Sequence, residues 1–220
     1  MWESWLACQD WIAKKVGKSP YEVLFNGDLV EGIHHKSLQV MSADAADQSA
    51  AVVDVIGPIA SKAVSVYLTK GTECHTRNDE CRIGREIGAI KDPSTGHYAW
   101  DRLELEFGKT VFTAAHHTST TSRPYLEASQ HSIALGVEIQ ERARNGKKIP
   151  KIIARAHRHI PGVWNDGRGI SIITGAWQGL TRHGNKVVPH AVPVPSCAIM
   201  DFRDCEPGDL PTIHQKVFIS

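Results

Sequence analysis

The chain has 220 residues, of which 41% are hydrophobic and 22% are charged, a balance that predicts one globular domain over residues 1–220 and excludes a disordered chain. The formal net charge of +1 gives no overall attraction to nucleic acid, although a local basic groove stays open. No apolar run reaches the ~18–20 residues that cross a bilayer, so we expect no membrane partner.

Helix and strand signals alternate in the first half of the chain. Apolar residues recur at helical spacing over 2–16, where tryptophans favour core or interface packing over a ligand platform, and Gly17 ends this helix. The apolar run 23–25 predicts a buried strand that ends at Asn26-Gly27-Asp28. The further predicted elements are a helix over 43–62, kinked or ended by Gly57-Pro58, a strand over 64–68 and a helix over 79–90.

Strand signals crowd together in the second half. Leu103, Leu105 and Phe107 alternate with glutamates, which is the period of a half-buried strand. The other predicted elements are strands over 111–115, 152–154 and 170–173, a helix over 125–144, and strand-like pieces around 197–202 and 216–219. This order predicts a layered α/β domain with a mixed sheet.

Histidine is the unusual residue type. The chain has twelve, several of them in close pairs, whereas its five cysteines are scattered without a Cys-x-x-Cys pair. The cysteines favour reduced thiols in a cytoplasm, and a thiolate zinc site has little support. Histidine enrichment indicates metal binding or acid–base chemistry, although the number of histidines alone is also compatible with ordinary surface residues.

Four predicted strands end in a polar cluster able to bind metal. Ligand sites in α/β sheets gather beyond the carboxyl ends of strands, and mixed carboxylate and imidazole groups suit divalent cations. Each cluster has an ordinary alternative, such as a turn residue or solvated histidines. If 157–159 is strand-like, its two imidazoles project to the same side. The clusters are Asn26-Gly27-Asp28, Gly71-Thr72-Glu73-Cys74-His75, His116-His117 and His157-Arg158-His159.

The order of these clusters resembles the successive motifs of calcineurin-like metallophosphoesterases. The details are similar to a phage- and prophage-encoded branch, in which Asn-Gly-Asp is followed by a His-His pair (here His34-His35) and Gly-Thr replaces Gly-Asn. The Gly175-Ala176-Trp177-Gln178 stretch is similar to that branch too. The resemblance covers roughly residues 20–185. It implies a layered sandwich of mixed β-sheets flanked by helices.

The resemblance also implies a site with one or two divalent metals, most often Mn²⁺, with Zn²⁺, Ni²⁺, Fe²⁺ or Mg²⁺ as alternatives. Asp28 would bridge the metals, while His75 would support the leaving group or the transition-state charge. The expected ligands beside Asp28 are His116 and His157 on the second metal, His159 on the first, and Thr72 or Glu73 in place of the family's asparagine. Residues expected to support them are Asn26, His35 and His117.

One motif of the family is missing. Its members open with Asp-x-His on the first strand, and no Asp-x-His precedes Asp28 here. We therefore expect the first strand to be absent from this chain, and the first metal to keep only Asp28 and His159. An upstream segment in a longer protein would account for the difference, and self-association would cover the gap in the sheet.

The leading hypothesis is a metal-dependent phosphodiesterase, a hydrolase from a phage or prophage that acts in the bacterial cytoplasm, with nucleic acid as one candidate substrate. The alternative is a degenerate relative that acts as a binding or structural module. Exposed tryptophans and the basic stretch 142–151 would then contact a partner, although such a stretch is more often a solvated helix end. A third hypothesis is a histidine site that binds one metal for stability alone.

Overall fold

The computed structural model describes residues 1–33, 40–76, 79–119, 123–181, 185–186 and 192–219. The chain divides into two compact units. The sheet unit consists of Met1–Cys8, Glu104–Ala114 and Thr118–Ser220, and the amino-terminal unit consists of Gln9–Leu103 and Ala115–His117.

A five-stranded sheet of order β3-β4-β5-β7-β6 forms the centre of the sheet unit, and only Leu103 of β3 belongs to the other unit. The strand β5 runs parallel to β4 and β7, whereas β6 runs antiparallel to β7, so the sheet is mixed, as predicted. All residues of β5 and β7 are buried, which agrees with their mainly apolar sequences. The strands are β3 (Leu103–Phe107), β4 (Thr110–Ala114), β5 (Ile152–Arg155), β6 (Gly162–Asn165) and β7 (Ile170–Ile173).

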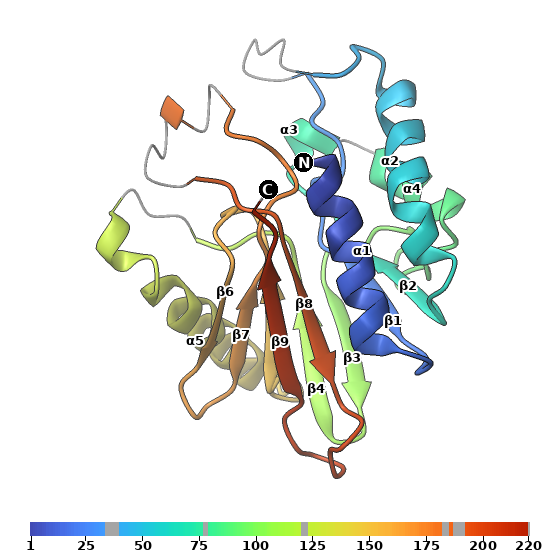
Figure 1. Ribbon diagram of the computed structural model, residues 1–220. Coiled ribbons are helices and arrows are strands. Elements are labelled where there is room, and N and C mark those ends of the chain that lie inside the picture. The colour runs from blue at the N-terminus through green and yellow to red at the C-terminus, as the bar shows by residue number, and fades with distance from the viewer. Residues whose placement is uncertain (34–39, 77–78, 120–122, 182–184, 187–191, 220) are drawn as a thin grey trace. The chain divides into compact units, whose positions relative to one another are not determined.

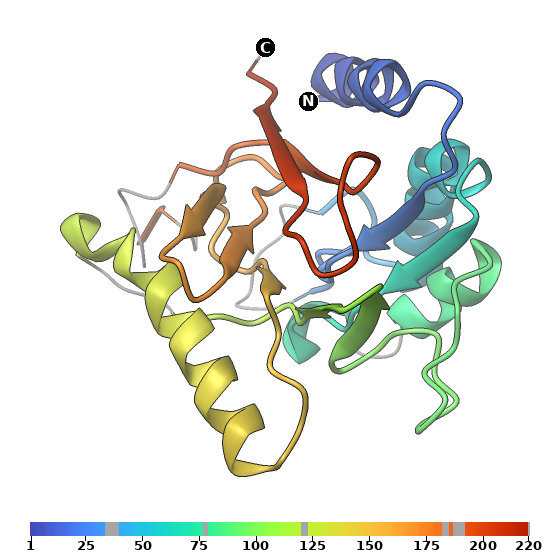
Figure 2. The same cartoon turned by 90° about the horizontal axis from the view of Figure 1, so that it is seen from below.

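Helix α5 (Ser129–Arg144) and an antiparallel pair of strands, β8 (Ser196–Asp201) and β9 (Thr212–Val217), cover this sheet. The two lie on opposite faces of the sheet (Figures 1 and 2). A short 3₁₀ helix, η1 (Pro124–Leu126), precedes α5. The sheet unit is therefore layered, with a helix on one face and strands on the other.

The amino-terminal unit is built on two parallel strands, β1 (Glu22–Phe25) and β2 (Ser65–Leu68). Helix α2 (Ala45–Ala60) packs beside α4 (Asp79–Glu86), while α3 (Glu73–Thr76) follows β2 in the chain (Figure 1). The carboxylate of Asp44 accepts a hydrogen bond from the Ala46 amide at 2.7 Å and so caps α2. The core of this unit contains Ala60, Val66, Leu68, Ala89 and Ala99.

Helix α1 (Trp2–Val16) has the predicted bounds, and its tryptophans differ in environment. Trp5 is buried, and its ring meets Trp177 edge-on with 4.9 Å between centroids, so the predicted packing role is confirmed for Trp5. Trp2 is 58% exposed. None of the helices within the described ranges is long and apolar enough to cross a membrane.

Several predicted boundaries were wrong for local reasons. The helix expected over 79–90 ends at Glu86, because Gly88 has a φ of +73° and the Ala89 amide bonds to Gly84 O, which closes the helix. The helix expected over 125–144 begins at Ser129, after the 3₁₀ turn. The strand β6 was not predicted, since its residues follow a histidine-rich loop and precede a glycine-rich turn.

Buried His131 in α5 predicts a loss of stability in acid. Burial lowers the pKa of His131, and the charge of Arg158 lowers it further, although Ser171 opposes this. As the pH falls through the ordinary histidine pKa of about 6.5, the unfolded chain takes up a proton that the folded chain does not, so the free energy of unfolding falls.

Urea unfolding between about pH 8 and pH 5 tests this. His131→Asn should give a shallower decline than the wild type, by at most about 1.4 kcal/mol per pH unit, the limit for one proton. Equal slopes in the two proteins would contradict the assignment.

Candidate functional site

The candidate site is built on the loops that follow β1 and β2. Because these strands are parallel, with Phe25 opposite Leu68, both loops leave the same edge of the strand pair. The first loop turns sharply: the φ angles of Gly27 and Asp28 are +73° and +53°. Aspartate adopts this left-handed conformation more readily than most residues, but it still costs about 1–3 kcal/mol and needs support from its surroundings.

The second loop supplies part of that support. A Cβ atom on Gly71 would lie 2.2 Å from the amide nitrogen of Asp28, so only glycine lets the two loops approach this closely. The Thr72 amide then donates to Asp28 Oδ1 at 2.5 Å, and the Thr72 hydroxyl donates to Oδ2 at 3.2 Å. The Asp28 carboxylate is thereby fixed in direction.

His116 meets the same carboxylate from the other side. Its side chain is buried, and Nε2 lies 2.8 Å from Asp28 Oδ2. Its Nδ1 lies 2.7 Å from the backbone carbonyl of Asn26, which accepts the Nδ1 proton and thus orients the ring. Asn26 is itself held, because its Oδ1 accepts a hydrogen bond from the Thr69 hydroxyl at 2.7 Å. The ring fits here because Gly27 has no Cβ atom, which would lie 2.6 Å from His116 Nδ1.

Asp28 and His116 each favour the charged form of the other. Burial alone would raise the pKa of Asp28, but His116 and the Thr72 amide outweigh it and lower the pKa to about 2. Burial likewise opposes the charged form of His116, yet Asp28 raises the pKa of His116 above its usual value. The site therefore presents a carboxylate and an imidazole nitrogen facing the same small space.

Glu80 of α4 is a component that the sequence did not predict. Its side chain is 1% exposed, Oε2 accepts the Gly71 amide at 2.6 Å, and Oε1 accepts the Leu29 amide at 3.3 Å. Burial raises the pKa of Glu80 to about 7. The hydrogen bonds from the two amides lower this pKa, whereas the charge of Asp28 raises it further. In the sequence Glu80 stands in a polar helix, and only its tertiary burial distinguishes it from the other charged residues of that helix, which are partly or fully exposed.

The other predicted residues of the amino-terminal unit differ in their surroundings. His117 is exposed, and its ring lies edge-on to His116 with 5.1 Å between centroids. His75 in α3 has its Nδ1 3.0 Å from the Glu31 carbonyl, while Glu73 begins α3 with an exposed side chain. Thr72 contacts Asp28, as described above. His35 lies outside the described residues.

The His157-Arg158-His159 segment lies in the sheet unit, and the expectation that it is strand-like was wrong. The strand β5 ends at Arg155, and the Arg158 amide bonds to Ala156 O at 2.8 Å, closing a tight turn around His157. The φ angles of His157 and His159 are +68° and +63°, so their imidazoles do not follow strand alternation.

Buried Arg158 holds this turn in place. Its guanidinium donates to the Ser119 carbonyl at 3.0 Å and pairs with the carboxylate of Glu127. Two left-handed residues beside one anchored arginine are typical of a functional segment. The predicted roles of His157 and His159 as metal ligands stay predictions.

Two of the five basic residues in the stretch 142–151 pair with acidic side chains of β3. Arg142 lies 2.6 Å from a Glu104 carboxylate oxygen, and Lys148 lies 2.7 Å from Glu106. The positive charge of this stretch is therefore partly neutralised within the sheet unit, which favours a solvated helix end over a groove for nucleic acid.

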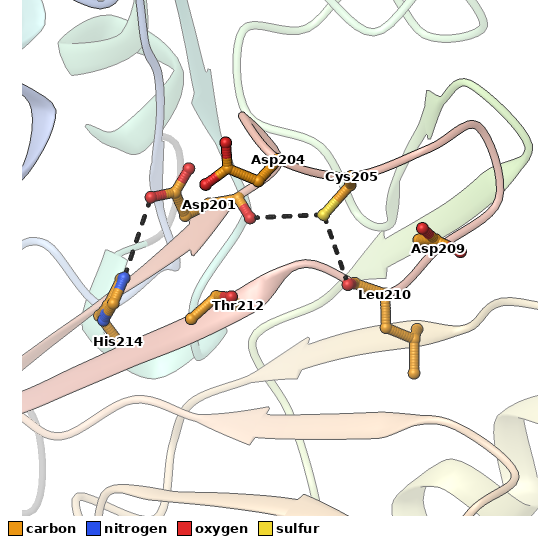
Figure 3. A pocket seen from close by; sticks show the side chains of 7 residues that line it. All are labelled: Asp201, Asp204, Cys205, Asp209, Leu210, Thr212 and His214. Carbon is orange, nitrogen blue, oxygen red and sulfur yellow. Dashed lines mark hydrogen bonds and ion pairs between the residues drawn. The ribbon is translucent and has the colours of Figure 1, made fainter.

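A second polar cluster lies in the connection between β8 and β9, around a hollow of about 590 Å³ (Figure 3). Asp201 is engaged by the Arg203 guanidinium, which holds the pKa of Asp201 well below its usual range, and lies 3.9 Å from His214 Nε2. The Cys205 thiol faces the Asp201 and Leu210 carbonyls. These contacts brace the connection, and we assign the cluster no ligand.

No protein-family model matches the chain, and no curated protein is similar to it in sequence. Among solved structures, an archaeal phosphodiesterase is similar over 98% of this chain and 92% of its own, with 14% identity and a TM-score of 0.53. Vps29 from Chaetomium thermophilum is similar over 95% and 87%, with 10% identity and a TM-score of 0.49. A single mutant of Vps29 from Entamoeba histolytica is similar over 96% of this chain and 89% of its own, with 12% identity and a TM-score of 0.45.

The archaeal phosphodiesterase has a TM-score above 0.5, and at 14% identity it is evidence for the fold alone. The sheet of mixed direction with helix α5 packed on one face agrees with that similarity. The chain therefore has the layered α/β fold of the metallophosphoesterase type, as its motifs predicted.

Proposed function

We propose that this chain binds a divalent cation at Asp28 and His116 and hydrolyses a phosphodiester. The observation that carries the proposal is the 2.8 Å approach of His116 Nε2 to Asp28 Oδ2, with the other ring nitrogen held by a backbone carbonyl. A carbonyl on the remote nitrogen is the usual arrangement for a histidine that binds metal.

The residues present fit such a cation. An imidazole nitrogen and a carboxylate oxygen suit Mn²⁺ first, and also Zn²⁺, Ni²⁺, Fe²⁺ or Mg²⁺. The charge of Asp28 contributes to the raised pKa of buried Glu80, which indicates a negative potential beside Asp28 that would favour a cation. Asn26 Nδ2 is a buried donor without a hydrogen-bond partner in the described part of the chain, as expected of a group that meets a ligand oxygen.

A bound cation polarises a phosphate ester and lowers the pKa of a coordinated water. The chain's own residues prepare the site for it: Thr72 fixes the direction of the Asp28 carboxylate, and Asn26 fixes the ring of His116. We assign His75 to the supply of a proton to the leaving oxygen, since the Glu31 carbonyl orients its ring. A nucleic-acid substrate, a phage or prophage origin and the bacterial cytoplasm stay predictions from the resemblance.

Metal removal tests the proposal. Protein treated with a chelator should not hydrolyse bis(p-nitrophenyl) phosphate, and Mn²⁺ should restore hydrolysis. Mn²⁺ at about 100 times its dissociation constant should also stabilise the fold by about 2.7 kcal/mol.

Other outcomes separate the competing functions. Absence of hydrolysis of any model phosphate ester with Mn²⁺, Ni²⁺, Zn²⁺ or Mg²⁺ would contradict the proposal. Stabilisation by metal without turnover would indicate a structural metal site. A tight complex with nucleic acid that needs no metal would indicate a binding module.

A further inference from the structure

We propose that Glu80 is a positioning residue that holds Asp28 in its left-handed conformation for cation binding. The inference rests on the proposed function, because it concerns the same ligand. Glu80 would not itself contact the cation or the substrate. It would act through the backbone of the two loops that meet at Asp28.

The contacts of Glu80 join these two loops. One carboxylate oxygen accepts the amide of Leu29, directly after Asp28, and the other accepts the amide of Gly71, directly before Thr72. The last ladder hydrogen bond between the strands runs from the Thr69 amide to Phe25 O, so both bonded amides lie beyond the sheet. One buried side chain therefore replaces the ladder where the parallel strands have ended.

Asp28 needs this connection because its backbone is strained. The φ of +53° persists only where neighbouring contacts fix it, and the close approach of Gly71 is one of them. If Gly71 withdraws, the Thr72 amide leaves Asp28 Oδ1, and the carboxylate loses the contact that fixes its direction toward His116. Glu80 thus affects the ligand through three successive backbone contacts.

The chemistry of the two bonds requires a carboxylate. Both oxygens of Glu80 accept from an amide, and glutamine would offer one acceptor oxygen and one NH₂ donor. Glu80→Gln keeps the size of the side chain but sets a donor against one of the amides. That substitution isolates the bonding from the packing.

The test compares Glu80→Gln with Glu138→Gln at about pH 8. Glu138 is a matched control because it is 2% exposed, also accepts two hydrogen bonds, and lies in the sheet unit. By titration calorimetry with Mn²⁺, Glu80→Gln should bind about 10–100-fold more weakly than the wild type, the usual cost of losing a partner of a metal ligand. Glu138→Gln should bind within about twofold of the wild type.

A second readout needs no metal. The Thr72 amide reports the position of Asp28, which it contacts, whereas Glu80 does not touch Thr72 by any described hydrogen bond. In ¹H–¹⁵N spectra, Glu80→Gln should shift the Thr72 amide proton upfield as its short bond to Asp28 lengthens. A role confined to stability would leave that resonance in place.

The outcomes distinguish this inference from the proposed function. If wild type binds no Mn²⁺, the proposed function fails, while the Thr72 resonance still decides whether Glu80 positions Asp28. If wild type binds Mn²⁺ and Glu80→Gln binds equally well with an unchanged Thr72 resonance, the positioning role is overturned.

Hydrogen exchange in the wild type decides the case if Glu80→Gln does not fold. The Leu29 and Gly71 amides lie outside helices and strands, so their protection would depend on Glu80. We expect both to exchange more slowly than the amide of Gly96, whose turn lies at an exposed position of the same unit. Exchange as fast as in an unbonded loop would overturn the proposal.

Discussion

Asp28→Asn is expected to abolish Mn²⁺-dependent hydrolysis while the protein keeps its fold. Asparagine adopts the left-handed conformation at least as readily as aspartate, so a φ of +53° is not a reason for misfolding. The amide oxygen can still accept the Thr72 amide, and the NH₂ group can donate to a neutral His116 at Nε2. The substitution therefore removes the charge and one ligand oxygen while the local geometry survives.

The expected effect is large because Asp28 would supply a charged ligand oxygen to the cation. Partners that merely orient a ligand contribute about 10–100-fold in metal affinity, so loss of the ligand should exceed about 100-fold. Hydrolysis under Mn²⁺ should fall to the rate of the chelator-treated wild type.

Titration calorimetry and the rate of diester hydrolysis measure this effect, with Asp44→Asn as the matched control. Asp44 is the exposed cap of α2, and asparagine caps helices as well as aspartate does. Asp44→Asn should retain the Mn²⁺ affinity of the wild type. Unchanged affinity in Asp28→Asn would remove Asp28 from the site and, with it, the proposed function.

The features that local patterns encode were predictable from the sequence. The strand before Asp28 ends where its apolar run ends, and the alternation of β3 follows its Leu-Glu pattern, with Leu103 fully buried. The motif order also placed Asp28 and His116 at strand ends, where the structure brings them within 2.8 Å. The spacing of apolar residues and the residues that end a strand determine these features, and both can be recognised in a short stretch of sequence.

The features that were missed depend on contacts between distant segments. Glu80 is a polar residue at the start of a helix, and its burial arises only when α4 packs beneath the loops after β1 and β2. The turn at His157 depends on the anchoring of Arg158 by Ser119 and Glu127, which lie more than 30 positions away. No short window contains such information.

Glu138→Ala is expected to lower the free energy of unfolding by about 3–5 kcal/mol, the largest stability effect that we predict. Glu138 in α5 and Arg155 in β5 form an ion pair of 2.7 Å with exposed fractions of 2% and 5%. Thr113 of β4 donates to the other carboxylate oxygen at 3.3 Å. Removal of the carboxylate leaves the Arg155 charge in the interior without its partner.

Urea unfolding measures the loss, and two further variants separate charge from packing. Glu106→Ala removes the partner of Lys148 from an exposed pair and should cost at most about 1 kcal/mol. The double variant Glu138→Leu with Arg155→Met removes both buried charges and should regain most of the lost stability. The reason is that the attraction within a buried ion pair is about as large as the free energy needed to remove both charges from water. If Glu138→Ala costs no more than Glu106→Ala, Arg155 must reach water or another acceptor once its partner is gone.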